Sequence, residues 1–187
     1  MNRDRRVART RAALIAAFDH LVLSRRGPKI RVADIVEKAN VGRSTFYDHY
    51  SSADDIHMAA LARPFATLAD AAAGIGDAAA LAPLLAHFWE NRQRARQTLD
   101  GRTGEKTARM LAGLVAERLP DDNALNIPRV LAARQLGDAA LSPVHGWITA
   151  EASCTPQALA DAICRAGRAL RTALTAVNSD APVTQPT

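Results

Sequence analysis

Aromatic and sulfur-containing side chains are scarce in this chain. Among its 187 residues there are 8 Phe, Trp and Tyr residues together, and two Cys. For a cytosolic protein we expect no structural disulfide between Cys154 and Cys164. Cys154 comes just before a predicted helix start, a position that can make a thiol reactive, so a redox-sensing role stays open.

Catalytic and metal-binding signatures are missing as well. The five His residues show no metal-ligand spacing, and the chain has no GxSxG, no HExxH and no phosphate-cradling Gly-rich loop. Asp121 and Asp122 lie in a loop-forming stretch and are best explained as solvated. We therefore expect no metal, no cofactor and no catalytic residue, which means that the chain is not expected to be an enzyme.

Long apolar runs are absent. The most apolar stretch, around Ala78–Trp89, is too short to span a bilayer. The N-terminus is rich in Arg and lacks the apolar run of a signal peptide. We therefore expect a cytoplasmic protein with no membrane contact.

Forty residues are Ala, apolar residues recur at helical spacing, and no strand-like alternation is visible, so we predict an all-α fold.

The segment 30–56 is the most informative part of the sequence. Its apolar residues between Ile30 and Ala39 recur at helical spacing, and Asn40 favours the left-handed conformation that ends a helix. A second short helix is predicted from Gly42 to Tyr50, with Phe46 and Tyr50 facing inward. Two short helices joined by a tight turn predict a helix-turn-helix, in which the second helix enters the major groove of DNA. Its outward side chains, Arg43, Ser44, Thr45, Tyr47 and His49, suit contacts to bases and phosphates.

At these residues the sequence resembles the TetR family of transcriptional repressors. The family pattern I-x-V-x-D-I-x-x-x-A-x-V-x-x-x-T-x-Y-x-H-[FY] is matched at Ile30, Val32, Asp34, Ile35, Ala39, Val41, Thr45, Tyr47, His49 and Tyr50. The resemblance covers about the first third of the chain. It implies a homodimer on a palindromic operator. It also implies that a small-molecule effector, bound in the larger C-terminal domain, releases the DNA.

The chain departs from the family pattern at four positions. Arg31 stands where the family usually has a phosphate-contacting Thr or Ser, and Ala53 stands where a Lys commonly reaches a phosphate. Gly42 and Asn40 replace a common Ser and Gly. We expect Arg31 to restore the positive charge that is lost at Ala53, so the departures affect individual phosphate contacts rather than DNA binding itself.

Charge is unevenly distributed along the chain. Residues 1–63 hold 12 Lys and Arg against 7 Asp and Glu, whereas residues 64–187 hold 12 of each. Arg3, Arg5, Arg6, Arg9 and Arg11 form a basic arm that leads into a first helix expected at about 4–24. Such an arm is either a solvated tail or a sequence-independent phosphate contact, and next to this motif we favour the phosphate contact.

We predict three parts along the chain. Residues 1–51 form the three-helix helix-turn-helix domain, residues 52–178 form a helical effector-binding and dimerisation domain, and residues 179–187 form a disordered tail. A helix that starts at Ser52 carries Pro64, which should kink or split it. Leu99–Gly104 reads as a loop, followed by a helix at about 105–119.

The last two predicted helices carry apolar seams. Val130, Ala133, Gly137, Leu141, Val144 and Ile148 recur every three or four residues, and so do Leu159, Ile163, Ala166, Leu170, Ala173 and Val177. Thr155-Pro156 is a good start for the second helix. The seams suit either a core within one chain or a dimer interface. The family resemblance favours a homodimer through these two helices.

The effector site is less clear from the sequence. If the resemblance holds, an apolar cavity is expected between the helices that follow the helix-turn-helix. Candidate lining residues are Phe65, Leu68, Leu84, Phe88, Trp89, Met110, Leu114 and Trp147, each of which is also a plausible core residue.

Three functions remain open from the sequence. The leading one is a sequence-specific transcriptional regulator, a repressor released by a small-molecule effector. The second is a regulator of the same fold without such an effector. The third is a helical carrier or enzyme that binds a ligand in its apolar domain, and it predicts no operator binding.

Overall fold

The computed structural model describes residues 2–24 and 30–175, and in these ranges all regular secondary structure is helical, which confirms the all-α prediction. The predicted tail at 179–187 and Val177 of the second seam lie outside the described residues. The chain divides into two compact units, Met1–Arg63 (unit 1) and Pro64–Thr187 (unit 2). The helices are α1 (Asn2–Ser24), α2 (Val32–Ala39), α3 (Arg43–Tyr47), α4 (Ala53–Ala72), α5 (Ala78–Glu90), α6 (Arg92–Leu99), α7 (Gly101–Ala116), α8 (Arg129–Ile148) and α9 (Pro156–Thr175), with a 3-10 turn, η1, at Asp122–Ala124.

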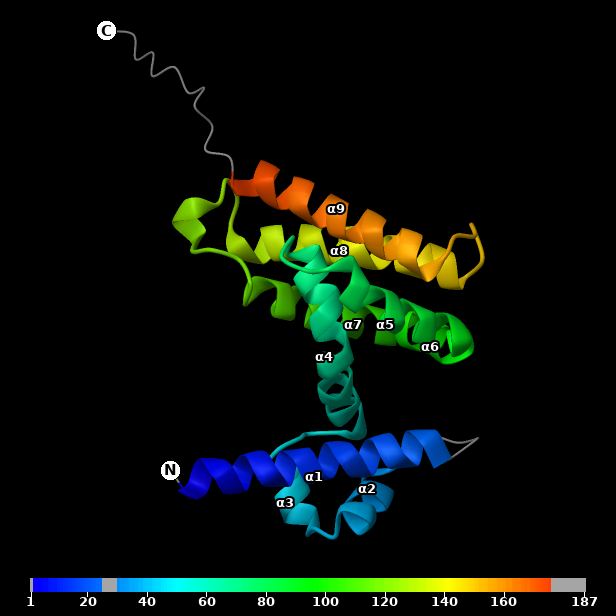
Figure 1. The fold of residues 1–187 in the computed structure, drawn as a ribbon. Coiled ribbons are helices and arrows are strands. Elements are labelled where there is room, and N and C mark those ends of the chain that lie inside the picture. Colours follow the sequence, from blue (N-terminus) through cyan, green and yellow to red (C-terminus); the bar gives the residue numbers. More distant parts are fainter. Residues whose placement is uncertain (1, 25–29, 176–187) are drawn as a thin grey trace, which may run out of the picture. The chain divides into compact units, whose positions relative to one another are not determined.

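Unit 1 is a three-helix arrangement in which α2 packs against the long helix α1 and against α3 (Figure 1). One apolar core holds the three helices and the first part of α4 together. Its buried members are Leu14, Phe18, Leu21, Ile35, Phe46, Tyr50 and Ile56. Because the core draws side chains from all four helices, it fixes the orientation of the short helix α3.

Helix α4 belongs to both units. It starts where predicted: the Asp55 amide donates to Ser52 Oγ at 3.2 Å, and the Asp55 carboxylate accepts from the Ser51 amide at 3.1 Å. Ile56 is fully buried in the core of unit 1, and unit 1 extends to Arg63. The functional boundary between residues 51 and 52 stays a prediction. Pro64 lies inside the helix without splitting it.

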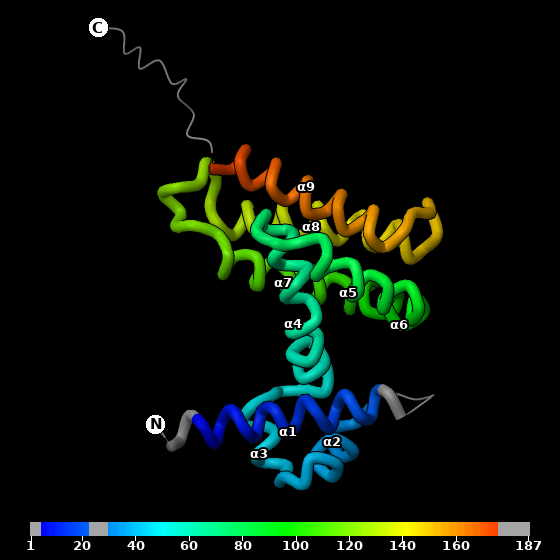
Figure 2. The backbone as a smooth tube through the Cα atoms, viewed as in Figure 1, coloured from blue at the N-terminus to red at the C-terminus, as the bar shows by residue number. Residues whose placement is uncertain are grey.

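Unit 2 is a bundle in which α8 and α9 lie side by side, with α5 and α7 packed against them (Figure 2). Two arginines hold the second part of α4 in this bundle. Arg118 donates to the Asp70 carboxylate at 2.5 Å and to the Leu114 carbonyl at 2.6 Å. Arg171 donates to the Ala73 carbonyl at 2.8 Å. The end of α4 is therefore fixed by polar contacts from both α9 and the segment that follows α7.

Gly167 lets α9 approach the end of α4 closely. A methyl group built on Gly167 would overlap the Ala71 carbonyl oxygen and lie 2.9 Å from that of Ala72. Only a residue without a side chain fits between these two backbones.

The expected loop at 99–104 was wrong. Helix α6 runs to Leu99 and α7 already starts at Gly101, so the connection is a single residue, Asp100. Gly101 has a φ of 53°, which turns the chain sharply enough to start a new helix at once. The buried Thr107 hydroxyl donates to the Thr98 carbonyl at 2.9 Å and ties the two helices together.

The seam of α8 is largely a core within the chain. Ala133, Gly137, Val144 and Ile148 are buried in unit 2, whereas Val130 is 71% exposed and Leu141 is half-buried. In α9, Leu159 and Ile163 are buried, whereas Ala166 and Ala173 are exposed and Leu170 is half-buried. Most of the α8 seam is thus used by packing within one chain, and any contact with a second copy would involve the exposed residues instead.

Candidate nucleic-acid interface

The turn between α2 and α3 has the predicted geometry. Asn40 has φ 52° and ψ 48°, the left-handed conformation that Asn tolerates better than most residues. Its amide donates to the Glu37 carbonyl at 3.2 Å, and the Val41 amide donates to the Val36 carbonyl at 3.1 Å. These bonds satisfy the last carbonyl groups of α2, so the turn is closed by the backbone and not by a ligand.

Helix α3 is shorter than predicted: it ends at Tyr47 and not at Tyr50. The chain continues in a turn in which the His49 amide donates to the Phe46 carbonyl at 3.0 Å. Phe46 is fully buried and Tyr50 is 6% exposed, with ring centroids 5.8 Å apart, as the sequence predicted for these inward residues. Phe46 is therefore the anchor that fixes which face of α3 points outward.

The outward face of α3 carries the candidate DNA-reading side chains. Arg43, Ser44 and Tyr47 are exposed, Tyr47 at 56%, whereas Thr45 and His49 are half-buried. Tyr47 packs edge-on against Phe46 with a centroid distance of 5.4 Å, which orients its ring. A guanidinium, a hydroxyl and a phenol on one short helix are donors of the kind that reach base edges and phosphates.

Gly42 starts α3 from an extended conformation, with φ −70° and ψ 154°. A methyl group at this position would meet side-chain atoms only, at 3.6 Å and 3.7 Å. The position therefore does not require glycine, and the Ser that is common in the TetR family would fit here.

Arg31, at the start of α2, is exposed and folded onto its own helix. Its amide donates to the Asp34 carboxylate at 3.1 Å, and its guanidinium lies 3.4 Å from the same carboxylate. The Arg31 side chain is 77% exposed, whereas the Asp34 side chain is only 9% exposed. The guanidinium is therefore accessible from solvent while it is paired with Asp34.

The arginines of the predicted arm lie on α1 itself, which begins at Asn2. Arg5, Arg6 and Arg9 are exposed within its first turns. Arg11 places its guanidinium 5.7 Å from the Tyr50 ring centroid. The basic residues from Arg5 onward thus sit at fixed helical spacing instead of forming a tail ahead of the first helix. The side chain of Arg3 is outside the described part of the chain.

The candidate effector residues form two aromatic pairs. Phe65, which is 1% exposed, lies 5.6 Å from Phe88 between ring centroids. Trp89 and Trp147 are stacked at 4.9 Å, and the Trp147 indole donates to the Cys154 carbonyl at 3.0 Å. Leu84, Met110 and Leu114 are half-buried, and Leu68 is fully buried. Packing between candidate residues is thus seen in the pairs Phe65–Phe88 and Trp89–Trp147.

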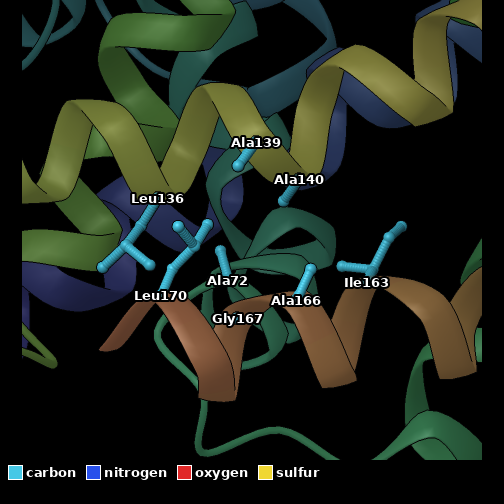
Figure 3. A pocket seen from close by; sticks show the side chains of 8 residues that line it. All are labelled: Ala72, Leu136, Ala139, Ala140, Ile163, Ala166, Gly167 and Leu170. Atoms are coloured by element: carbon cyan, nitrogen blue, oxygen red, sulfur yellow. The ribbon is translucent and has the colours of Figure 1, made fainter. Parts of the chain in front are cut away.

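A hollow between α4, α8 and α9 has a different lining (Figure 3). It offers no room for a water molecule. Its lining residues are Ala72, Leu136, Ala139, Ala140, Ile163, Ala166, Gly167 and Leu170. None of these residues belongs to the set expected to contact an effector, so the effector site stays a prediction.

The residues that the structure describes carry neither a metal-binding cluster nor a membrane-spanning helix. No group of three or more His, Cys, Asp and Glu side chains is placed to hold a metal ion in this part of the chain. Over the same residues, no helix combines the length and apolar character needed to cross a membrane.

His57 joins α4 to α1 within unit 1. Its ring lies 5.5 Å from the Phe18 ring centroid at an angle of 34°. Burial lowers the pKa of His57 below its ordinary value of 6.5, and the carboxylates of Asp54 and Asp19 act in the opposite direction. Burial also raises the pKa of Asp19, which Arg63 and His57 lower in turn. The packed form of His57 is therefore the neutral one.

Unit 1 is expected to lose stability as the pH falls from 7 to 5. The unfolded chain binds a proton on His57 near pH 6.5, before the folded chain does, so protonation favours unfolding in this range. His57→Phe keeps a ring against Phe18 and removes the titration. Urea unfolding followed by circular dichroism should show a smaller loss between pH 7 and 5 for this variant than for the native chain. His20→Gln, an exposed position on α1, is the control, and equal losses in native and His57→Phe proteins would contradict the prediction.

Comparison with known proteins gives partial similarities. No protein-family model matches the chain. An uncharacterized HTH-type transcriptional regulator of Bacillus subtilis, YxbF, is 41% identical over 68 residues, which are 36% of this chain and 18% of that protein. The chain thus matches less than a fifth of that relative's length.

Two solved structures align over most of the chain. A TetR transcriptional regulator of Streptococcus agalactiae has 26% identity and a TM-score of 0.49, covering 89% of this chain and 98% of its own. RolR in complex with resorcinol has 20% identity and a TM-score of 0.44, covering 92% and 98%. Resorcinol is the ligand of RolR and is not assigned to this chain.

Some features of the site were not predicted from the sequence. The Arg11–Tyr50 contact joins residues 39 positions apart, and no local pattern connects them. The Arg118–Asp70 ion pair likewise spans 48 positions. The only signal was that Arg118 interrupts an apolar segment, Met110–Leu119, where a charged residue needs a partner.

Proposed function

We propose that this chain is a DNA-binding transcriptional regulator of the TetR type, whose reading head is α3. The observation that carries the proposal is the outward face of this helix. Buried Phe46 locks α3 in place, and Arg43, Ser44 and Tyr47 are left exposed on a unit whose net charge is positive. The 41% identity to a helix-turn-helix regulator over 68 residues supports the same function.

The residues have distinct roles in this proposal. Arg43, Ser44 and Thr45 contact bases, because they occupy the first turn of α3, the part of a recognition helix that meets base edges. Tyr47 and His49 contact the phosphate backbone, and so does Arg31, by leaving Asp34. The arginines of α1 add a contact to phosphates that does not depend on sequence.

Repression, assembly and release complete the proposal. The chain acts as a homodimer through exposed residues of α8 and α9, such as Val130 and Ala166, on a palindromic operator. A small-molecule effector binds in unit 2 among Phe65, Leu84, Phe88, Trp89, Met110, Leu114 and Trp147 and lowers DNA affinity by its differential binding free energy. No catalytic step is part of this function.

A regulator of the same fold without an effector is the second candidate. It requires no ligand cavity in unit 2, and the hollow of Figure 3 has no room for a water molecule. A ligand screen that leaves both the melting temperature and the DNA affinity unchanged would favour this candidate.

Arg43→Ala tests the reading head. A bidentate contact between Arg and a guanine contributes about 1–3 kcal/mol, so the variant is expected to bind the DNA upstream of its own gene about tenfold to a hundredfold more weakly. Gel-shift titrations at low salt measure the change, with Arg134→Ala on α8 as a control far from α3 in sequence. The proposal fails if the native chain does not bind this DNA at low salt and Arg43→Ala changes nothing.

A further inference from the structure

The positive charge of unit 2 is concentrated on one pair of helices. Residues 91–109, which include α6 and most of α7, hold six Lys and Arg against two Asp and Glu. The remaining residues between 64 and 187 hold six against ten. Unit 2 is neutral as a whole, so this separation is not visible in its net charge.

Helix α6 exposes Arg92 and Arg94, whereas Arg96 is half-buried and anchors the helix. None of its residues is buried. Arg96 donates to the Ile148 carbonyl at 3.0 Å. Arg92 covers the Trp89 ring at 5.4 Å, and Trp89 stacks on Trp147. A helix that is polar all round gains little from burial, so its stability comes from these anchors.

Helix α7, which packs against α6, carries two more exposed arginines. Arg102 and Arg109 are exposed, seven residues apart, and therefore separated by about 10 Å along the helix axis. This spacing corresponds to about three base-pair rises of duplex DNA. We name Arg92, Arg102 and Arg109, with the exposed amides Gln93 and Gln97, the α6–α7 ridge.

We propose that the α6–α7 ridge is a second surface for duplex DNA, which contacts phosphates outside the segment read by α3. It rests on the proposed DNA-binding function, because that function brings duplex DNA to the protein. Arginine forks and amides suit phosphate oxygens. Trp89 is covered by Arg92 and Trp147, so the ridge offers no aromatic platform for the stacked bases of a single strand.

A solvated face is the simplest alternative for exposed charge. Such a face usually mixes both signs, which keeps a protein soluble without creating a large field. Here residues 91–109 carry a net charge of +4, whereas the rest of unit 2 carries a net charge of −4. A concentrated positive field attracts polyanions, and a duplex is the polyanion that the proposed function brings to the protein.

The test compares salt dependence on two lengths of DNA. The full chain and the variant Arg92→Gln/Arg102→Gln/Arg109→Gln are titrated with duplexes from the region upstream of its own gene, about two and about six helical turns long. Each phosphate contact adds about 0.9 to the slope of log K against log salt. We expect the variant to lose about 2–3 of this slope on the long duplex and none on the short one.

The matched control is Arg134→Gln/Arg165→Gln/Arg168→Gln, which removes the same charge from exposed arginines of α8 and α9. The double variant Arg102→Gln/Arg109→Gln keeps Arg92 over Trp89 and guards against a loss of folding. In a second arm, the protein is saturated with the short duplex and a duplex of unrelated sequence is then added. Binding of the added duplex shows whether the α6–α7 ridge can hold a DNA molecule other than the one bound by α3. The proposal is supported if the triple variant loses salt dependence on the long duplex or loses binding of the second duplex.

An unchanged slope in the triple variant, in both the long-duplex and second-duplex arms, overturns the ridge as a DNA surface and leaves an acidic protein as its partner. The variant Arg43→Ala distinguishes a failure of the ridge proposal from a failure of the proposed DNA-binding function of α3. If short-duplex binding depends on Arg43 while the slope is unchanged in the triple variant, only the second surface is wrong. If binding is indifferent to Arg43 but lost in the triple variant, the reading head is wrong and the ridge stands.

Discussion

Phe46→Ala is expected to unfold unit 1 and abolish DNA binding while unit 2 stays folded. Phe46 is fully buried in the core that joins α1, α2 and α4, and removing a buried Phe side chain costs about 3–5 kcal/mol. A small unit with one core has little more stability than this. The variant should therefore lose the helical signal of unit 1 and its affinity for any duplex that depends on α3.

The two tryptophans allow this outcome to be measured separately in each unit. Trp89 and Trp147 both lie in unit 2, and both tyrosines lie in unit 1. Unfolding followed by Trp fluorescence should be the same in Phe46→Ala and in the native chain, whereas circular dichroism should show the loss of helix. Tyr47→Ala is the control, since this neighbour is 56% exposed: it should weaken DNA binding without unfolding the unit. Native-like DNA affinity in Phe46→Ala would show that α3 does not depend on its anchor.

Gly167→Ala is expected to destabilise unit 2 by about 3 kcal/mol, which lowers its melting temperature by roughly 10 °C. The added methyl group overlaps the Ala71 carbonyl oxygen, and a backbone atom cannot move aside as a flexible side chain can. Helix α9 must therefore shift away from the end of α4. The usual gain of about 1 kcal/mol from replacing a helical Gly by Ala is too small to offset this strain.

Gly113→Ala is the matched control for this prediction. Gly113 lies in α7 with no heavy atom within 4 Å of the added methyl group. Here only the helix propensity changes, so the variant should gain about 0.5–1 kcal/mol. Thermal unfolding followed by Trp fluorescence measures both variants. If Gly167→Ala also raises the melting temperature, the close approach of α9 and α4 is not present in solution.

The helix-turn-helix was predictable because its determinants are local. The helical period of residues 30–39, the left-handed preference of Asn40 and the inward spacing of Phe46 and Tyr50 each act within a few residues. The end of α3 was predicted three residues too late, because a period of 3.6 continues equally well through the turn that follows it.

Unit 2 was harder to predict because its determinants are distant in sequence. A seam at helical spacing on α8 shows which residues are apolar, but not whether they face the same chain or another copy. The structure buries Ala133 and Val144 against neighbouring helices of the chain and leaves Val130 exposed. The break between α6 and α7 depends on a single left-handed residue, Gly101, whereas the sequence around it resembles a longer loop.

The fully buried side chain of Ile56 has a consequence for protein engineering. A biosensor that borrows the reading head of this chain should be joined after Arg63, because a fusion cut at residue 51 would remove Ile56 and leave a hole in the donor's core. The junction then lies directly before Pro64 of the native chain. Pro64 has no backbone N–H, so α4 already lacks one hydrogen bond at this residue. A junction here therefore removes fewer helical hydrogen bonds than a junction one turn to either side.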